Sequence, residues 1–168
     1  GLEEWVKYEL KEHINSGRLI YYRTSEPLYF HRSHSRNMAF KLATGDVICN
    51  IDADNFTGNN FAYFINEQFT SDKNIFIAAD TLNRYYFIRD VCGRICFWRK
   101  DFDVLGGFDE YMGGYGDEDV DLINRLKAIG RKEVIIQDKD FLKAIPHTDL
   151  ERIQNEYTIS NLKAIYVS

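Results

Sequence analysis

One short apolar run sets the strongest constraint on how this chain can fold. Residues 46–51 (DVICNI) are mostly hydrophobic, follow a glycine that can end a helix, and lead directly into two acidic residues. Such a run is typical of a strand buried on both faces, as in parallel sheets that are covered by helices. The sequence therefore predicts the α/β class, with a mostly parallel sheet flanked by helices.

Helical and strand-like patterns alternate on both sides of this run. Helices are predicted at 2–16, 35–44, 57–69, 117–128 and 150–166, and strands at 18–23, 46–51, 74–79, within 84–98 and at 133–137. An α/β domain rarely begins on a surface helix, so we expect the first β-α-β unit of the fold to be missing. We therefore expect residues 1–168 to form a single domain that is a fragment of a longer one, with the missing unit upstream in the longer protein.

Composition excludes several classes of protein. With 45% hydrophobic residues the chain can form a sizeable core, and its net charge of −5 argues against a sequence-independent nucleic-acid binder. No apolar run approaches the roughly 18 residues that a membrane span needs. The odd number of cysteines, 3, fits buried reduced thiols in a cytoplasmic protein, with any membrane association supplied by parts outside this chain. The sequence carries no signal for oligomeric state.

Asp52 and Asp54 follow the predicted buried strand directly. In an extended segment their side chains would point to the same side, at the carboxyl end of the strand, where ligands bind in open α/β sheets. Paired carboxylates suit Mg²⁺ or Mn²⁺, and these ions suit a diphosphate. A simple turn explains the same residues about equally well.

Four acidic residues crowd the start of a predicted helix: Asp117, Glu118, Asp119 and Asp121. Helix capping and the helix dipole would explain one or two of them. Four in five residues exceed that need, and a carboxylate held there could act as general base towards a hydroxyl. We therefore favour a site over simple capping.

Basic and aromatic side chains supply further candidates. Arg36, with Asn37, is expected at the start of a helix, where helix N-termini attract phosphate. His31 and His34 could also bind phosphate, although exposed loop charges are the commoner explanation. His147 taken alone is best explained as a surface residue. Sugar rings could stack on some of the aromatic residues, of which we single out Trp98, Tyr111 and Tyr115.

Taken in order, these blocks resemble the metal-dependent glycosyltransferases of the GT-A fold. The resemblance is to family 2 and to the galactosyltransferase and N-acetylgalactosaminyltransferase groups, and it extends from Arg36 to His147. It is carried by the segments 35–39 (SRNMA), 43–46 (ATGD), 51–54 (IDAD), 93–99 (GRICFWR), 105–110 (LGGFDE) and 114–122 (GYGDEDVDL), and by the late proline-histidine pair. The combination is much more specific than any one segment.

The resemblance implies an enzyme that moves a hexose or N-acetylhexosamine from a UDP-sugar to a saccharide hydroxyl with inversion, in polysaccharide biosynthesis. It implies Mn²⁺ or Mg²⁺ as cofactor. Asp54 and His147 would ligate the metal, and Asp52 would contact the ribose or the metal through water. The remaining roles it implies are these: Asp119 as general base, Glu118 as a sugar contact, Arg36 near the nucleotide, and Gly106 and Gly107 along the sugar site.

Two other functions remain open from the sequence. One is a non-catalytic relative that only binds a sugar or nucleotide. The other is a metal-dependent phosphohydrolase on an α/β fold.

Overall fold

The computed structural model describes residues 1–25, 31–82, 87–112 and 117–148. The chain divides into two compact units, residues 1–30 and 31–168, and each is considered by itself. The prediction of one domain therefore stays a prediction. The helix predicted at 150–166 lies outside the described residues.

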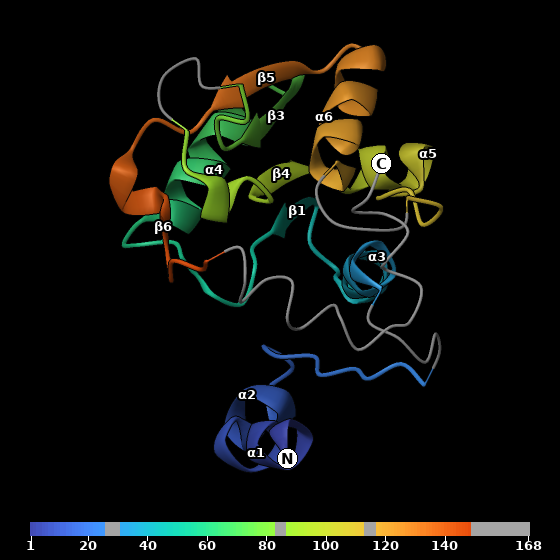
Figure 1. The fold of residues 1–168 in the computed structure, drawn as a ribbon, viewed down its shortest axis with the longest axis vertical. Helices are drawn as coiled ribbons and strands as arrows, with labels where there is room; N and C mark the ends of the chain where they lie inside the picture. Colours follow the sequence, from blue (N-terminus) through green and yellow to red (C-terminus); the bar gives the residue numbers. More distant parts are fainter. Residues whose placement is uncertain (26–30, 83–86, 113–116, 149–168) are drawn as a thin grey trace. The chain divides into compact units, whose positions relative to one another are not determined.

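The N-terminal unit holds two short helices, α1 (Leu2–Glu9) and α2 (Lys11–Asn15), in place of the single helix predicted over 2–16 (Figure 1). The break falls at Leu10, whose φ of −108° and ψ of 19° leave the helical region. The strand predicted at 18–23 is wrong, because these residues form no ladder. A lone segment without a neighbouring strand leaves its backbone groups to water, whatever its side chains favour.

The larger unit is built on a four-stranded sheet in the order β1-β4-β3-β5. Its strands are β1 (Val47–Asn50), β3 (Ile75–Ala78), β4 (Ile95–Trp98) and β5 (Lys132–Ile135). β3 pairs with β5 in parallel, while β4 is antiparallel to both β1 and β3. β1, β3 and β5 therefore point the same way, and β4 is reversed between them. The α/β class with a sheet flanked by helices is confirmed; three of the four strands run in one direction, and β4 runs against them.

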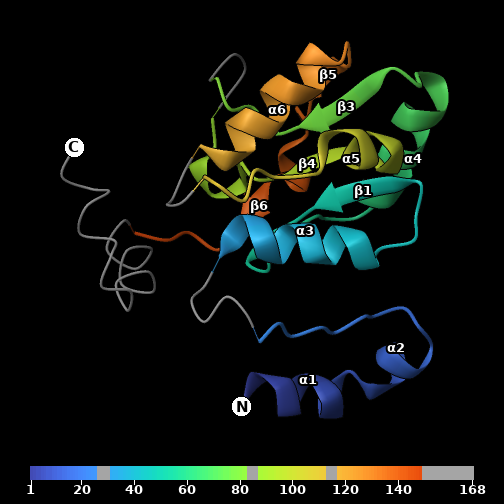
Figure 2. The ribbon, with the colours of Figure 1, turned by 90° about the vertical axis from the view of Figure 1, so that its right-hand side faces the viewer.

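Helices cover both faces of this sheet (Figures 1 and 2). The helices of this unit are α3 (Arg32–Leu42), α4 (Phe61–Ser71), α5 (Arg99–Leu105) and α6 (Glu118–Ala128). The sequence predicts α3, α4 and α6 with shifted ends, and it misses α5. α5 is marked by Phe102 and Leu105, one turn apart, and by Gly106, whose positive φ of 74° ends the helix.

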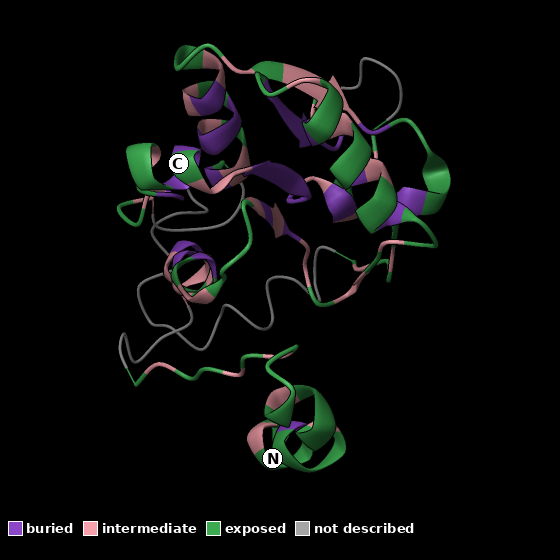
Figure 3. Ribbon diagram, turned by 180° about the vertical axis from the view of Figure 1, so that it is seen from behind, coloured by how far each residue is buried: buried purple, intermediate pink, exposed green. Residues whose placement is uncertain are grey.

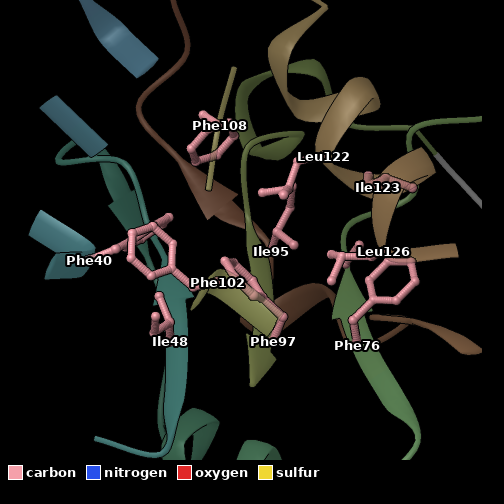
Figure 4. Close-up of a cluster of buried hydrophobic side chains, with 11 residues drawn as sticks. Phe40, Ile48, Phe76, Ile95, Phe97, Phe102, Phe108, Leu122, Ile123 and Leu126 are labelled. Atoms are coloured by element: carbon pink, nitrogen blue, oxygen red, sulfur yellow. The ribbon is translucent and has the colours of Figure 1, made fainter. Parts of the chain in front are cut away.

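Successive residues of the central strands pack on opposite faces. In β3, Phe76 and Ala78 join a cluster with side chains of α3, α5 and α6, whereas Ile75 and Ile77 face side chains of α4. Figure 4 shows the first cluster, and Figure 3 shows the buried central strands and helices that carry both buried and exposed residues. Burying one such large apolar side chain contributes about 1.5–3 kcal/mol. This two-sided burial explains why the strands are apolar throughout.

A second, two-stranded sheet positions the site. β2 (Asn55–Phe56) pairs antiparallel with β6 (Lys143–Ala144), which follows a short 3₁₀ turn at Lys139–Phe141. Another 3₁₀ turn, Arg89–Val91, precedes β4. Because β2 begins one residue after Asp54, this pairing brings the segment that ends in His147 alongside the acidic turn.

Candidate active site

Asp52 and Asp54 lie in a turn after β1. The backbone N–H of Asn55 donates to the carbonyl oxygen of Asp52 at 2.9 Å, which closes the turn. The expectation that both carboxylates lie in an extended segment and point to one side is therefore wrong. Instead the two side chains have different partners, Arg36 for Asp52 and His147 for Asp54.

Asp54 and His147 form one half of the site. His147 Nε2 and Asp54 Oδ2 share a hydrogen bond of 2.8 Å, and the side chains are 35% and 34% exposed. The backbone N–H of Ile145 donates to the Asp54 carbonyl oxygen at 2.9 Å, which extends the β2–β6 pairing. Arg89 Nη2 donates to the His147 carbonyl oxygen at 3.1 Å. The loop histidine is thus fixed beside the acidic turn by backbone contacts on two sides.

This half has a donor set that fits a divalent cation. A carboxylate oxygen and an imidazole nitrogen are adjacent and open to solvent, and Mg²⁺ is commonly held by one or two carboxylates plus substrate phosphates and water. Within the described residues no group of three or more His, Cys, Asp or Glu side chains converges on one point. The described side chains would therefore supply two ligands, and substrate phosphates and water would complete the coordination.

Arg36 joins the acidic turn to the start of α6. Its Nη2 donates to Asp52 Oδ1 at 2.9 Å, and its Nη1 donates to Asp119 Oδ1 at 3.0 Å and to Glu118 Oε1 at 3.3 Å. Arg32, one turn earlier on α3, donates to the same Glu118 oxygen at 3.4 Å. α3 begins at Arg32, so Arg36 lies in its second turn. The expectation that Arg36 begins a helix is therefore wrong, and in this structure Arg36 contacts carboxylates.

Asp119 has a strongly raised pKa. The pKa of Asp119 is raised from 3.8 to about 6, mainly by burial; the charges of Glu118 and Asp52 add to the increase, and those of Arg36 and Arg32 oppose it. A carboxyl group with a pKa near 6 is well matched to proton transfer at neutral pH. The Asp119 side chain is only 13% exposed, and Glu118 beside it is 6% exposed.

The other two acids of this cluster have structural roles. Asp117 occupies the N-cap position of α6, as the sequence predicts, although its side chain makes no capping hydrogen bond. Asp121 pairs with Arg125 one turn further on, at 2.7 Å. Two of the four acids, Glu118 and Asp119, thus face Arg36.

Asn37 holds the loop after α5 in place. Its amide donates to the Phe108 carbonyl oxygen and accepts from the Phe108 N–H, both at 2.8 Å, and it also donates to Glu110 at 2.9 Å. A Cβ at Gly107 would overlap both Asn37 Oδ1 and the Phe102 ring. Gly107 therefore allows close packing, and Gly106 ends α5. Their expected place along the sugar site stays a prediction.

The histidines of α3 bind this loop as well. His34 Nδ1 lies 2.9 Å from Glu110 Oε2, and His31 Nε2 lies 3.0 Å from the Glu110 carbonyl oxygen. Hydrogen bonds from Asn37 and His34, together with the His34 charge, outweigh desolvation and lower the pKa of Glu110. Of the aromatic candidates, Trp98 packs on Phe69, Tyr111 is 99% exposed, and Tyr115 lies outside the described residues.

Two further residues next to the acidic turn were given no role from the sequence, although Arg94 lies in one of the segments that carry the resemblance. Asn55 donates to Asp54 Oδ1 at 2.9 Å, and the buried Arg94 donates to Asn55 Oδ1 at 3.0 Å. An asparagine after two aspartates is typical of a turn, and an arginine inside a strand-like run gives no sign of its partner.

The described helices include none long and apolar enough to cross a membrane.

Two solved glycosyltransferase structures are similar to this chain. A mannosyltransferase from Pyrobaculum calidifontis, in complex with GDP-Man and Mn²⁺, has a TM-score of 0.61 and 16% identity over 98% of this chain, which spans 52% of that protein. A mutant of a Drosophila beta-1,4-galactosyltransferase 7, in complex with manganese, UDP-Gal and xylobiose, has a TM-score of 0.56 and 17% identity over 99% of this chain and 75% of its own. At these identities the likeness shows the fold.

Together with a family match, this fold places the chain in the class of GT-A glycosyltransferases. Residues 73–159 match the family described as the N-terminal domain of galactosyltransferase, and the chain belongs to that family. A search among curated proteins returns no significant match.

Proposed function

We propose that this domain transfers a hexose or N-acetylhexosamine from a UDP-sugar to a saccharide hydroxyl, with a divalent metal and with inversion. The observation that carries the proposal is the Arg36 contact. One guanidinium joins Asp52, beside the candidate metal ligand, to Asp119, the carboxylate with a pKa of about 6. A donor-binding half and a proton-accepting half therefore lie within the reach of one side chain.

In the donor half, Asp54 and His147 would hold Mn²⁺ or Mg²⁺. When bound, the metal would neutralise charge on the departing diphosphate. Asp52 and Arg36 would contact the nucleotide, and Gly106 and Gly107 would border the sugar. Arg36 donates hydrogen bonds to three carboxylates, those of Asp52, Glu118 and Asp119. If the guanidinium moved to bind a phosphate, these hydrogen bonds would weaken.

In the acceptor half, Asp119 would accept the proton of the attacking hydroxyl. The hydroxyl oxygen would form the new bond to the anomeric carbon from the face opposite the departing diphosphate. One direct displacement inverts the anomeric centre. Glu118, buried beside Asp119, would orient a sugar hydroxyl. A cytoplasmic role in polysaccharide biosynthesis completes the proposal, and the free thiols of Cys49, Cys92 and Cys96 fit a reducing compartment.

The test is calorimetric titration of the chain with UDP, once with Mn²⁺ and once with EDTA. We expect binding with Mn²⁺ that EDTA removes, and weaker binding of GDP, the nucleotide part of the donor bound by the mannosyltransferase neighbour. Asp103→Ala, which removes an exposed carboxylate on α5, is the matched control and should bind as the wild type does. Equal binding with EDTA would contradict the metal site.

A second assay separates transfer from the other two functions. UDP release from UDP-sugars should depend on an added saccharide acceptor. Phosphate release that needs no acceptor would indicate a phosphohydrolase. Nucleotide binding without turnover of any UDP-hexose or UDP-N-acetylhexosamine, across a panel of saccharides, would indicate a non-catalytic binding protein.

A further inference from the structure

Arg94 carries a buried charge, and packing alone does not explain why an arginine occupies this position. The residue is 0% exposed and lies against the ring of Phe61, 5.8 Å from the ring centroid. Its Nε and Nη1 are buried and find no hydrogen-bond partner among the residues that the structure describes. A buried guanidinium in this state destabilises a fold, and an apolar side chain of similar volume would serve packing better.

The third nitrogen of this guanidinium is linked to the acidic turn through Asn55. Arg94 Nη2 donates to Asn55 Oδ1 at 3.0 Å. The Asn55 NH₂ group donates to Asp54 Oδ1 at 2.9 Å and to the Asp90 carbonyl oxygen at 3.0 Å. An amide has one acceptor end and one donor end, and a guanidinium can only donate. Arg94 therefore fixes which end of the Asn55 amide faces Asp54.

Both oxygens of the Asp54 carboxylate are thereby held. Oδ1 accepts from Asn55, and Oδ2 pairs with His147 at 2.8 Å. The backbone of Asn55 also belongs to this arrangement, because Asn55 is opposite Ala144 in the β2–β6 ladder, three residues before His147. One residue thus orients the carboxylate with its side chain and aligns the histidine segment with its main chain.

We propose that Arg94 and Asn55 are positioning residues that hold the Asp54 carboxylate towards His147 for a divalent cation. This inference rests on the proposed function, since it takes Asp54 and His147 as the metal ligands. Hydrogen bonds to a ligating carboxylate fix its orientation before the ion arrives, and losing them typically lowers metal affinity about 10- to 100-fold. Neither residue would touch the ion.

Arg131 provides the matched contrast. It is a partly buried arginine, and it binds both oxygens of the buried Asp101, at 2.9 and 2.6 Å. Removing Arg131 leaves a buried carboxylate without its cation, so stability should fall. Arg131 has no contact with the acidic turn in the described structure, so manganese affinity should not change. Removing Arg94 should instead lower manganese affinity without lowering stability.

The experiment measures Mn²⁺ binding in the presence of UDP by electron paramagnetic resonance of the free ion, together with thermal unfolding, on the full chain. For Arg94→Met we expect affinity to fall at least about 10-fold, with an unchanged or higher melting temperature. Arg94→Lys keeps the charge but not the fork, so we expect partial recovery. Asn55→Ala should lower the affinity by a similar factor, and adding Arg94→Met to it should lower it little further.

The inference is overturned if Arg94→Met and Asn55→Ala bind Mn²⁺ as the wild type does. It is also overturned if Arg131→Met lowers the affinity as much as Arg94→Met, because a general loss of structure would then be the cause. Should Arg94→Met not fold, Asn55→Ala, which changes a half-buried residue, decides alone. A wild-type chain that binds no Mn²⁺ overturns the proposed metal site itself, a result distinct from normal binding in both variants.

Discussion

The two halves of the candidate site are built in different ways. Asp54 and His147 are about one-third exposed, and backbone pairing between two short strands holds them. Glu118 and Asp119 are nearly buried, and the Arg36 guanidinium on a helix holds them. A site that takes up an ion and a nucleotide must be open, whereas a carboxylate that accepts a proton near neutral pH must be partly removed from water. The exposed half therefore suits binding of the ion and the nucleotide, and the buried half suits acceptance of the proton.

The strongest test of the buried half is Asp119→Asn. It should reduce transfer by about 10²- to 10⁴-fold, the usual contribution of a general base, while Mn²⁺-dependent UDP binding stays within about 2-fold of wild type. Steady-state transfer and calorimetry on the same preparation measure both. Retained turnover would remove Asp119 from the role of base.

Stability provides the control for this variant. Burial holds the pKa of Asp119 at about 6 rather than 3.8, so the native state binds a proton more tightly than the unfolded chain. The stability that this provides at low pH is lost as pH rises from about 4 to 6, and one pKa unit corresponds to about 1.4 kcal/mol. At pH 7 the ionised group destabilises the fold by roughly 3 kcal/mol, so Asp119→Asn should unfold at higher denaturant.

The open half is tested by Asp54→Ala. The change removes the carboxylate expected to bind the metal, so Mn²⁺-dependent affinity for UDP should fall by on the order of 100-fold, and transfer should fall with it. Titration with and without EDTA measures the loss. An affinity equal to that of Asp103→Ala would exclude Asp54 from the metal site.

His147→Ala should have a smaller effect in the same half. One ligand would be lost while Asp54 and the phosphates remain, so we expect Mn²⁺ affinity to fall roughly 10-fold with little change in saturated UDP affinity. Manganese titrations at fixed UDP measure it. An unchanged titration would mean that His147 is only a surface residue.

The contact between the halves is tested by the pH dependence of transfer. A base with a pKa of about 6 gives a rate that rises as pH increases through 6 and then levels. Arg36 stabilises the ionised form of Asp119, so Arg36→Met should raise the pKa of Asp119. The rise in transfer rate should then occur at a pH that is roughly 1 unit higher. Arg36→Lys should move it less. Identical limbs in both variants would show that the halves are electrostatically independent.

Sequence reasoning succeeded where a signal is local. Apolar periodicity predicted β1, β3, α3, α4 and α6, and the order of motifs indicated the GT-A class. It failed where the outcome depends on distant partners: the reversal of β4, the missing ladder at 18–23, and the pairing of Lys143–Ala144 with Asn55–Phe56. Pairing between strands is decided by tertiary packing, which no window of residues contains.

The candidate site shows the same division. Asp52, Asp54, Glu118 and Asp119 were found because acids at a strand end and a helix start are visible in the sequence. Arg36 was found as well, but its contacts with these acids were not predicted, since Arg36 lies 83 residues from Asp119 along the chain. The roles assigned to these side chains stay predictions that the variants above can decide.

The tight contact at Gly107 has a consequence for directed evolution. Any side chain there would enter the volume of Asn37 and Phe102, and the φ of 78° disfavours every other residue as well. A mutant library that randomises this loop to alter sugar preference should therefore keep position 107 fixed. Diversity belongs at Tyr111, four residues on, whose side chain is almost fully exposed and can be exchanged without disturbing the helix or the loop.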